Sequence, residues 1–403
     1  MVNKFFHYFN VIFIILFFPS FVTGIFLPNL ICGLFIIVNC IFNFKKIKNL
    51  FLEYYKVSFL FTGFCVLIIL SSIFSKNINH SLETSLLYFL FSIYTLSIVL
   101  LFIENIKFRK IFFLCGITTC IILSIDAFYE LYSGTNILGY SSIEGRIAGL
   151  FGERWLIGRY LVYILPVIVG LYFLDIEYLK NYRLIFYFTI ILVSIIIIFS
   201  GERAAFLMLV IYSFMLLVFF LKKLPTTKLL IMIIFLTILF VSPFLFSESS
   251  ERIKDNLILY LTSNDFEKNP YLSMFLSSWK MFIDNPILGV GPNNFRFLCS
   301  DSSYIVSVRS CSTHPHSITF QILAEIGIFG FIGVFSVFSY FFYKSFILAS
   351  LKYYSNKALG FYSLQCSVLL YLFPFMITGN FFLSWYGFIF YLPIGLYMVY
   401  LRN

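Results

Sequence analysis

Stretches of about twenty consecutive apolar residues recur along this chain of 403 residues, and they constrain its fold more than any other feature. A helix of about 20 apolar residues is long enough to cross roughly 30 Å of hydrocarbon. Hydrophobic residues make up 61% of the chain and charged residues only 11%. Backbone groups inside a bilayer must be hydrogen-bonded within their own segment, so each run is expected to be a helix. The sequence therefore predicts an all-α, polytopic integral membrane protein.

The apolar runs predict about twelve transmembrane helices in one integral membrane domain, residues 1–403, with one large loop at residues 247–316. The first run has no small-residue cleavage site and is followed at once by a second, so we expect a retained helix and not a signal peptide. The spans are predicted at residues 11–24, 25–44, 57–74, 82–103, 111–129, 156–174, 184–199, 204–221, 229–246, 317–343, 359–378 and 385–401.

Lysine and arginine in the short links predict the orientation of the spans. If both termini lie inside the cell, the inner links hold 17 of the 28 cationic residues and four of the 18 acidic ones. The large loop then faces outside. Topology and anionic lipid at the inner surface explain the net charge of +10, and nothing in it indicates nucleic-acid binding.

Arginine is concentrated on the predicted outer side, where it provides 7 of 11 cations, whereas lysine provides 14 of 17 inside. The positive-inside rule does not distinguish the two residues. A planar guanidinium grips phosphate oxygens in bidentate fashion, so an arginine-lined outer cavity suggests a phosphate or diphosphate ligand. Alternatively, these arginines pair with outer acids or lipid headgroups. The seven are Arg146, Arg154, Arg159, Arg203, Arg252, Arg296 and Arg309.

Arg203 lies in a very short turn between two apolar runs, at or just below the predicted outer membrane surface. A cation close to hydrocarbon is usually retained for a partner. We interpret Arg203 as a diphosphate ligand, and an ion pair with the neighbouring Glu202 is the alternative.

Arg146 lies in the glycine-rich stretch EGRIAGLFGERWLIGRYL that opens the sixth span. Irregular backbone at membrane depth is tolerated where it lines a protein-walled cavity. Arg146, Arg154 and Arg159 are therefore candidates for facing such a cavity. The alternative is an ordinary outer loop whose arginine side chains snorkel, with their guanidinium groups in solvent at the start of a helix.

His314 and His316 flank Pro315 immediately before the tenth predicted span. Imidazole has a pKa near neutrality and can take a proton from a sugar hydroxyl. These residues are candidates for proton transfer, and capping-turn histidines at the surface are the alternative.

Gln321 and Glu325 lie four residues apart, on one face of the tenth predicted span. Nine residues of helix would place Glu325 about 13 Å deeper than His316. A carboxylate inside a membrane is a functional candidate by default, although it could pair with an arginine on a neighbouring helix.

Two of the eight cysteines, Cys299 and Cys311, lie in the large loop, and the sequence favours a disulfide between them on an oxidising side of the membrane. Together with His314 and His316 they could instead ligate zinc, but their spacing fits no standard structural zinc pattern. We therefore predict no metal and no cofactor. Within the same loop, the apolar stretch 272–282 is expected to form an interfacial helix.

Three segments of the chain resemble the O-antigen ligase and O-antigen polymerase superfamily of bacterial envelope enzymes. They are RIAGLFGERWLIGRYL, SGERAAFLMLV, and NPILGVGPNNF followed by HPHSITFQILAEIGIFG. The resemblance implies a GT-C-like, metal-independent glycosyltransferase that faces the periplasm and whose ligase-like core spans residues 184–345. It assigns catalytic roles to His316 and Arg203. Many relatives have an arginine shortly before the loop tryptophan, here Trp279, but YLSMFLSSW has none. The second diphosphate ligand is therefore open between Arg146 and Arg309.

The resemblance implies an undecaprenyl diphosphate-linked glycan as donor. The acceptor is lipid A-core in a ligase, another lipid-linked glycan in a polymerase, or a protein. The predicted location is the bacterial inner membrane, with a periplasmic loop and cytoplasmic termini. A transporter or flippase for a lipid-linked anionic glycan is the alternative from another class. It is expected to show two repeated halves with broken helices, and no such repeat is evident. A purely structural membrane protein would leave the arginine distribution unexplained.

Overall fold

The computed structural model describes residues 2–103, 105–141, 146–246, 269–374, 376–377 and 379–402. A helix occupies each of the twelve predicted spans, which confirms the all-α class. In chain order these are α1 (Val2–Ser20), α2 (Phe26–Glu53), α3 (Tyr55–Ile73), α4 (Ile78–Phe102), α5 (Ile106–Ser133), α6 (Ile157–Leu174), α8 (Arg183–Phe199), α9 (Arg203–Phe220), α10 (Thr226–Phe246), α14 (Ile318–Ser350), α15 (Asn356–Tyr371) and α16 (Ser384–Arg402).

Nine helical stretches within the described ranges are long and apolar enough to cross a membrane, and Lys4–Ser20 of α1 forms a shorter apolar helix. The chain is therefore a multi-pass membrane protein. Twelve crossings stay a prediction, because length and composition support nine.

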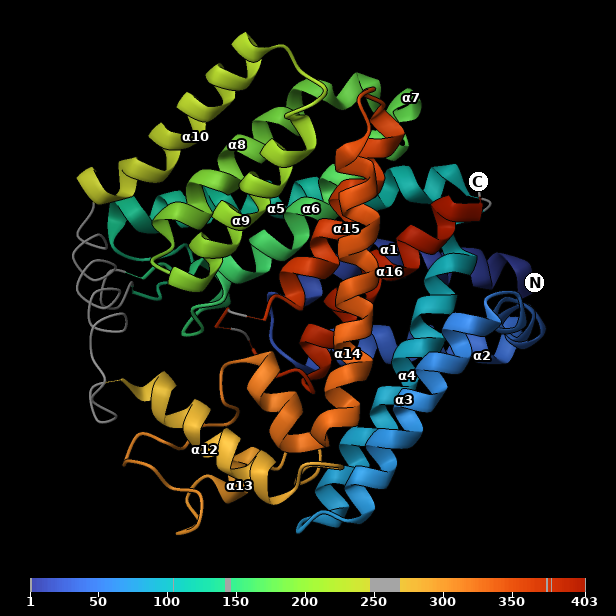
Figure 1. Cartoon of the computed structure of the whole chain (residues 1–403). Coiled ribbons are helices and arrows are strands. Elements are labelled where there is room, and N and C mark those ends of the chain that lie inside the picture. The colour runs from blue at the N-terminus through green and yellow to red at the C-terminus, as the bar shows by residue number, and fades with distance from the viewer. Residues whose placement is uncertain are drawn as a thin grey trace.

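Contacts between the segments that join or end the helices define two ends of the helix bundle. At one end Arg109, at the start of α5, pairs with Asp175 after α6, and Arg402 of α16 pairs with Glu53 of α2. Both termini lie toward this end (Figure 1), which we call the tail end. It carries the links that the charge distribution predicts to face inside.

The opposite end, which we call the loop end, carries the described part of the large loop, residues 269–316. Ser71 Oγ near the end of α3 donates to Leu288 O at 2.6 Å, and Gln321 Nε2 of α14 donates to Asn380 Oδ1 at 2.6 Å. Helices α12 (Pro270–Asp284) and α13 (Phe295–Leu298) lie here, below the main bundle in the view of Figure 1.

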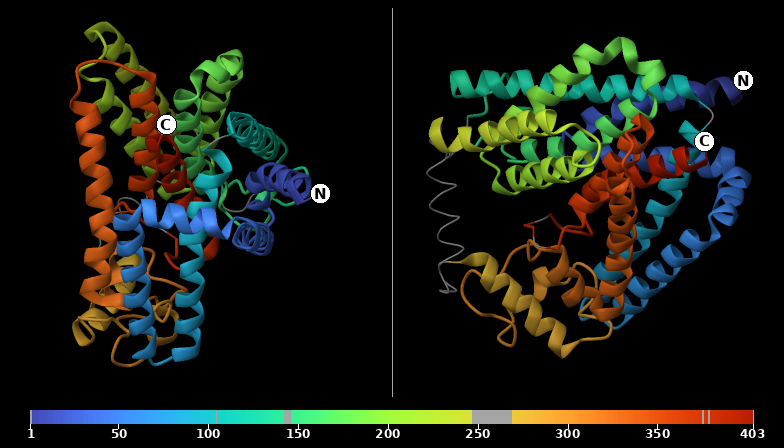
Figure 2. Two further views of the ribbon diagram at one scale, coloured as in Figure 1. Left: turned by 90° about the vertical axis from the view of Figure 1, so that its right-hand side faces the viewer. Right: turned by 45° about the horizontal axis from the view of Figure 1, so that its top comes forward.

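Two groups of helices make up the bundle. Helix α3 packs against both α4 and α14, whereas α5, α8, α9 and α10 lie in the other half (Figures 1 and 2). Helix α15 packs against α6, and α16 packs against α4, so these two helices join the halves. Helices α6 and α15 approach each other closely at Gly170 and Gly360. A Cβ at Gly360 would lie 3.0 Å from Gly170 O, so small residues are required there.

The tenth predicted span is not one continuous helix, and this corrects the sequence-based expectation. Gly327 breaks α14 with φ 67° and ψ −165°. A Cβ at Gly327 would collide with the carbonyl of Ile287, and one at Gly289 would collide with the backbone of Glu325. The two glycines therefore allow the 286–291 turn to pack directly against the break. We call Ile318–Ile326 the half-helix.

The 286–291 turn also completes the hydrogen bonding of the half-helix. The last carbonyl groups of a helix have no partner within it. Here Val290 N donates to Ala324 O at 2.8 Å, Gly291 N donates to Glu325 O at 2.9 Å, and Ile328 N donates to Pro286 O at 2.8 Å. The break is thus held by backbone bonds from a segment that lies 34 to 42 residues earlier in the chain.

The eleventh helix is shorter than predicted. Helix α15 ends at Tyr371, whereas the apolar pattern continues to Thr378, which lies outside the described residues. Pro374 explains the early end, because a proline disfavours helical backbone in the residue before it. The residues released from the helix form part of a link to α16, which reaches the loop end.

Candidate functional site

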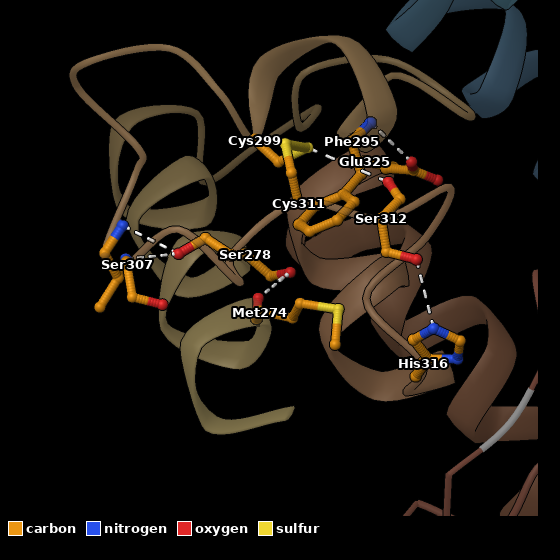
Figure 3. Close-up of a disulfide and its surroundings, with 11 residues drawn as sticks. Met274, Ser278, Phe295, Cys299, Ser307, Cys311, Ser312, His316 and Glu325 are labelled. Carbon is orange, nitrogen blue, oxygen red and sulfur yellow. Dashed lines mark hydrogen bonds between the residues drawn. A yellow bond between two sulfur atoms is a disulfide. The ribbon is translucent and has the colours of Figure 1, made fainter. Parts of the chain in front are cut away.

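His316 lies at the junction of the large loop and the half-helix. Its backbone has a positive φ of 56°, which is rare for a residue with a side chain and which turns the chain into α14. Its Nε2 atom lies 3.3 Å from Ser312 Oγ (Figure 3). The ring of Tyr271, in α12, meets the imidazole edge-on at 5.8 Å between centroids. The loop thus presents a partly exposed imidazole held from two sides.

His314 lies directly beside His316, with ring centroids 4.1 Å apart. Its Nδ1 atom is 3.0 Å from Thr313 Oγ1, and its side chain is buried. The two predicted histidines are therefore brought together, and the more accessible of them is His316.

Cys299 and Cys311 form a disulfide next to the histidine turn, with their Cα atoms 5.0 Å apart. Figure 3 shows Ser312 between this disulfide and His316. The two sulfurs are bonded to each other and cannot serve as thiolate ligands of zinc in this state. Among the residues that the structure describes, no three His, Cys, Asp or Glu side chains gather as a metal site would require.

Glu325 holds the loop to the half-helix. Its Oε1 accepts from Phe295 N, the first residue of α13, at 2.9 Å, and its Oε2 accepts from Gln321 Nε2 at 3.0 Å. The side chain is fully buried, and its backbone oxygen accepts from Ser71 near the loop end of α3. Glu325 therefore lies at the loop end and not deep along a continuous span. Its contacts are those of a positioning residue.

Arg203 begins α9 after a turn that contains Gly201 at φ 71°. The carboxylate of the preceding Glu202 is hydrogen-bonded to backbone N–H groups. Its Oε1 accepts from Gly158 N at 2.7 Å and from Arg159 N at 3.4 Å, at the start of α6. A carboxylate is stabilised at a helix N-terminus by the unpaired N–H groups and the helix dipole. Glu202 thereby docks α6 onto the turn that carries Arg203.

Arg146 reaches the same turn from the segment before α6. Ile147 N donates to Ser200 O at 3.2 Å, and the Arg146 guanidinium lies over the Trp155 ring at 4.7 Å from its centroid. We call Arg146, Arg159, Glu202 and Arg203 the arginine cluster. The structure therefore brings two of the three predicted diphosphate ligands into one neighbourhood.

The charge of Glu202 depends on its surroundings. Burial raises the pKa of this carboxyl to about 7, against the smaller opposing effects of the Arg159 charge, the α6 backbone N–H groups and the Arg146 charge. The electrostatic balance of the arginine cluster therefore changes near neutral pH.

The other outer arginines are placed differently. Arg309 is exposed within the loop that the Cys299–Cys311 disulfide closes, where its backbone N–H donates to Ser307 Oγ at 3.2 Å. Arg154 donates to Val22 O at 2.7 Å and stacks on Phe151, which makes it a tether between α1 and the segment before α6. Arg252 lies outside the described residues.

The link between α15 and α16 is bonded both to the half-helix that follows His316 and to the arginine cluster. Gln321, five residues after His316, donates to Asn380 and accepts from Phe381 N at 2.9 Å. A few residues later, the Tyr386 hydroxyl accepts from Arg159 Nη1 at 3.0 Å. Asn380 and Tyr386 were not predicted from the sequence. A polar Asn380 in a short link between two apolar spans was the available signal.

Asn293 of the large loop makes a further contact that was not predicted from the sequence, with the start of α4. His80, at the start of α4, lies 3.0 Å from Asn293 Nδ2, and the Asn293 Oδ1 accepts from Asn380 Nδ2 at 2.9 Å. The NNF part of the loop motif is thus hydrogen-bonded both to α4 and to the α15–α16 link.

A family model matches part of the chain. Residues 188–335 match a family model described as O-antigen ligase. The matched region runs from α8 through Arg203 and the loop to the first part of α14, and so it contains both Arg203 and His316. No curated protein matches the chain.

Proposed function

We propose that this chain, a member of the O-antigen ligase and polymerase superfamily, transfers a glycan from undecaprenyl diphosphate to an acceptor hydroxyl. The acceptor in this proposal is lipid A-core, the ligase reaction of lipopolysaccharide biosynthesis. It is supported by the family match, which contains both Arg203 and His316, and by the α15–α16 link, which is hydrogen-bonded to Gln321 of the half-helix and to Arg159 of the arginine cluster.

His316 is proposed as the general base. Its imidazole takes the proton of the acceptor hydroxyl, and the oxygen attacks the anomeric carbon of the donor from the face opposite the diphosphate. The new C–O bond forms as the bond to the diphosphate oxygen breaks, so the configuration inverts. The Ser312 hydroxyl and the Tyr271 ring edge restrict how the imidazole turns, and fixed orientation is what a general base requires.

The arginine cluster is proposed to hold the leaving diphosphate. In this proposal Arg203 and Arg146 provide two guanidinium groups, and Arg146 is favoured over Arg309 because the neighbouring Ile147 N donates to Ser200 O, in the turn before Arg203. Guanidinium groups held in place before the reaction stabilise the negative charge that grows on the leaving oxygen. In this proposal arginine supplies the charge that a metal supplies elsewhere, and no metal is needed.

The loop end is proposed to face the periplasm and the tail end the cytoplasm of the bacterial inner membrane. The lysine-rich links and both termini then lie inside, as the positive-inside rule predicts. The arginine cluster and His316 then meet lipid-linked glycan after it has crossed the membrane.

A deletion strain complemented with the wild-type gene or with the His316→Ala variant tests this function. We expect the deletion and the variant strains to accumulate lipid-linked polymer and to carry lipid A-core without long chains. Core capped by single repeat units would replace the ligase proposal with the polymerase reaction. A strain that accumulates its glycan only on the cytoplasmic side would instead indicate a flippase and would contradict glycosyl transfer.

A further inference from the structure

A polar cavity lies at the tail end, away from His316 and the arginine cluster. Its volume is about 590 Å³, within the range of pockets that hold small ligands. Its walls come from α1, the later part of α2, the α4–α5 link and the end of α16. Helix α2 has one non-helical residue, Asn43 (φ −121°, ψ 18°), and this bend lies in the cavity wall.

Asparagine dominates the polar lining of this cavity, which is unusual so close to apolar helices. The five are Asn10, Asn39, Asn43, Asn49 and Asn105. Two pair with each other, since Asn43 Nδ2 donates to Asn39 Oδ1 at 3.1 Å, and Asn105 caps α5 by accepting from Phe108 N.

Asn10 is different, because it is only 4% exposed and its Oδ1 has no hydrogen-bond partner among the described residues. A buried acceptor without a donor costs free energy, so the cavity lacks a hydrogen-bond donor at this point.

The charges around the cavity favour an anion. Arg402 and Glu53 form an ion pair at 3.3 Å and largely compensate each other. Lys46 also lines the cavity and leaves it with a positive balance. A ligand that fits must therefore carry negative charge for Lys46 and a hydroxyl donor for Asn10.

We propose that this cavity binds a phosphate ester that bears free hydroxyl groups, with the phosphate at Lys46 and a hydroxyl donating to Asn10 Oδ1. Two sources share this chemistry: the headgroup of an anionic lipid, such as a phosphoglycerol, and a soluble sugar phosphate. The site is independent of the proposed glycosyl transfer, since it lies at the opposite end of the bundle.

Native mass spectrometry of the purified full-length protein tests the proposal with three lipid probes. These are phosphatidylglycerol, phosphatidic acid, which lacks the hydroxyls, and zwitterionic phosphatidylcholine. We expect the wild type to retain phosphatidylglycerol best. Lys46→Gln should weaken retention about tenfold, as for loss of a charge-assisted bond, and Asn10→Leu about fivefold, as for loss of one neutral bond. Lys352→Gln, an exposed tail-end lysine outside the cavity, is the matched control and should change nothing.

Glucose 1-phosphate, added in a thermal-shift assay, separates the two sources. A stabilisation lost in Lys46→Gln but kept in Lys352→Gln, without selective lipid retention, supports the site and assigns it to a soluble ester. Equal retention of all lipids by wild type and Lys46→Gln, with no shift by glucose 1-phosphate, overturns the proposal. Lys46 is exposed, so this variant is expected to fold even if Asn10→Leu does not.

Discussion

Two buried groups of arginine and carboxylate lie at opposite ends of the bundle, and they are built differently. At the tail end, Arg109 donates Nε and Nη2 to the two oxygens of Asp175 at 2.8 and 3.2 Å, and Tyr400 donates to the same carboxylate. At the loop end, Arg159 and Glu202 make no such bidentate pair. Glu202 Oε2 and Arg159 Nε have no hydrogen-bond partner among the described residues.

Under the proposed function, the difference is that between a structural group and a group that binds a ligand. In the bidentate Arg109–Asp175 pair, the third guanidinium nitrogen, Nη1, donates to Phe102 O. All three nitrogens of Arg109 are therefore already hydrogen-bonded within the protein. Polar atoms without a hydrogen-bond partner at a buried site cost free energy, and they usually have a functional explanation. We therefore expect changes at the loop end to affect turnover and changes at the tail end to affect stability.

The largest effect on turnover is expected for His316→Ala. Loss of a general base typically lowers the rate by about 10²–10⁴-fold, and the variant should remain folded because the imidazole is partly exposed. Transfer of labelled glycan by purified protein measures the effect. His314→Ala, the neighbouring ring, is the control and should be milder. Near-normal turnover in His316→Ala would remove this residue from the mechanism.

A loss of about 100-fold is expected for Arg203→Lys, because an ammonium group cannot reproduce two parallel hydrogen bonds to a diphosphate. The matched substitution at the tail end, Arg183→Lys, should leave donor turnover unchanged. The kcat/KM for the glycan donor, measured for both variants and the wild type, tests this expectation. If both variants behave alike, the arginine distribution has no connection with phosphate.

Asp175→Asn should lower the free energy of unfolding by about 3 kcal/mol, since it leaves a buried guanidinium without its charge partner. Turnover per folded molecule should be unchanged. Thermal unfolding in detergent, with activity normalised to the folded fraction, measures both quantities. A reduced rate with unchanged stability would contradict the structural assignment of the Arg109–Asp175 pair.

The smallest effect is a pH dependence from Glu202. Its raised pKa of about 7 means that the folded protein keeps a proton that the unfolded chain releases near pH 4.3. Stability from this group is therefore greatest at low pH and is lost as the pH rises to about 7.

The same titration should affect donor binding. Above pH 7 the ionised Glu202 offsets the arginine charge, so donor KM should rise about threefold between pH 6 and 8. Glu202→Gln should flatten the profile, measured as KM separately from kcat. A wild-type KM that is constant over this range would show that Glu202 does not face the bound donor.

The helices were predictable because apolar runs in a membrane permit almost no other backbone. The proximity of His314 to His316 and of Gln321 to Glu325 followed from local spacing. The break at Gly327 did not, because a glycine in an apolar run is compatible with close helix packing as well as with a turn. Its cause, the 286–291 backbone, lies 34 to 42 residues earlier in the chain than the groups it bonds. The contacts of Asn380, Tyr386 and His80 likewise depend on tertiary packing that no local pattern reveals.

The half-helix has a consequence for how the protein is made. The apolar run that contains it is long enough to be inserted as one unbroken helix, and it carries no proline at the break. The turn that caps the break is synthesised first and already lies on the outer side of the membrane in the proposed orientation. In the folded protein, the packing of Gly289 against Glu325 and of Gly327 against Ile287 holds the turn against the break between the two pieces of α14. Maturation of the histidine turn would thus be a step after insertion, and a side chain at either glycine would trap the protein as an inserted but unassembled precursor.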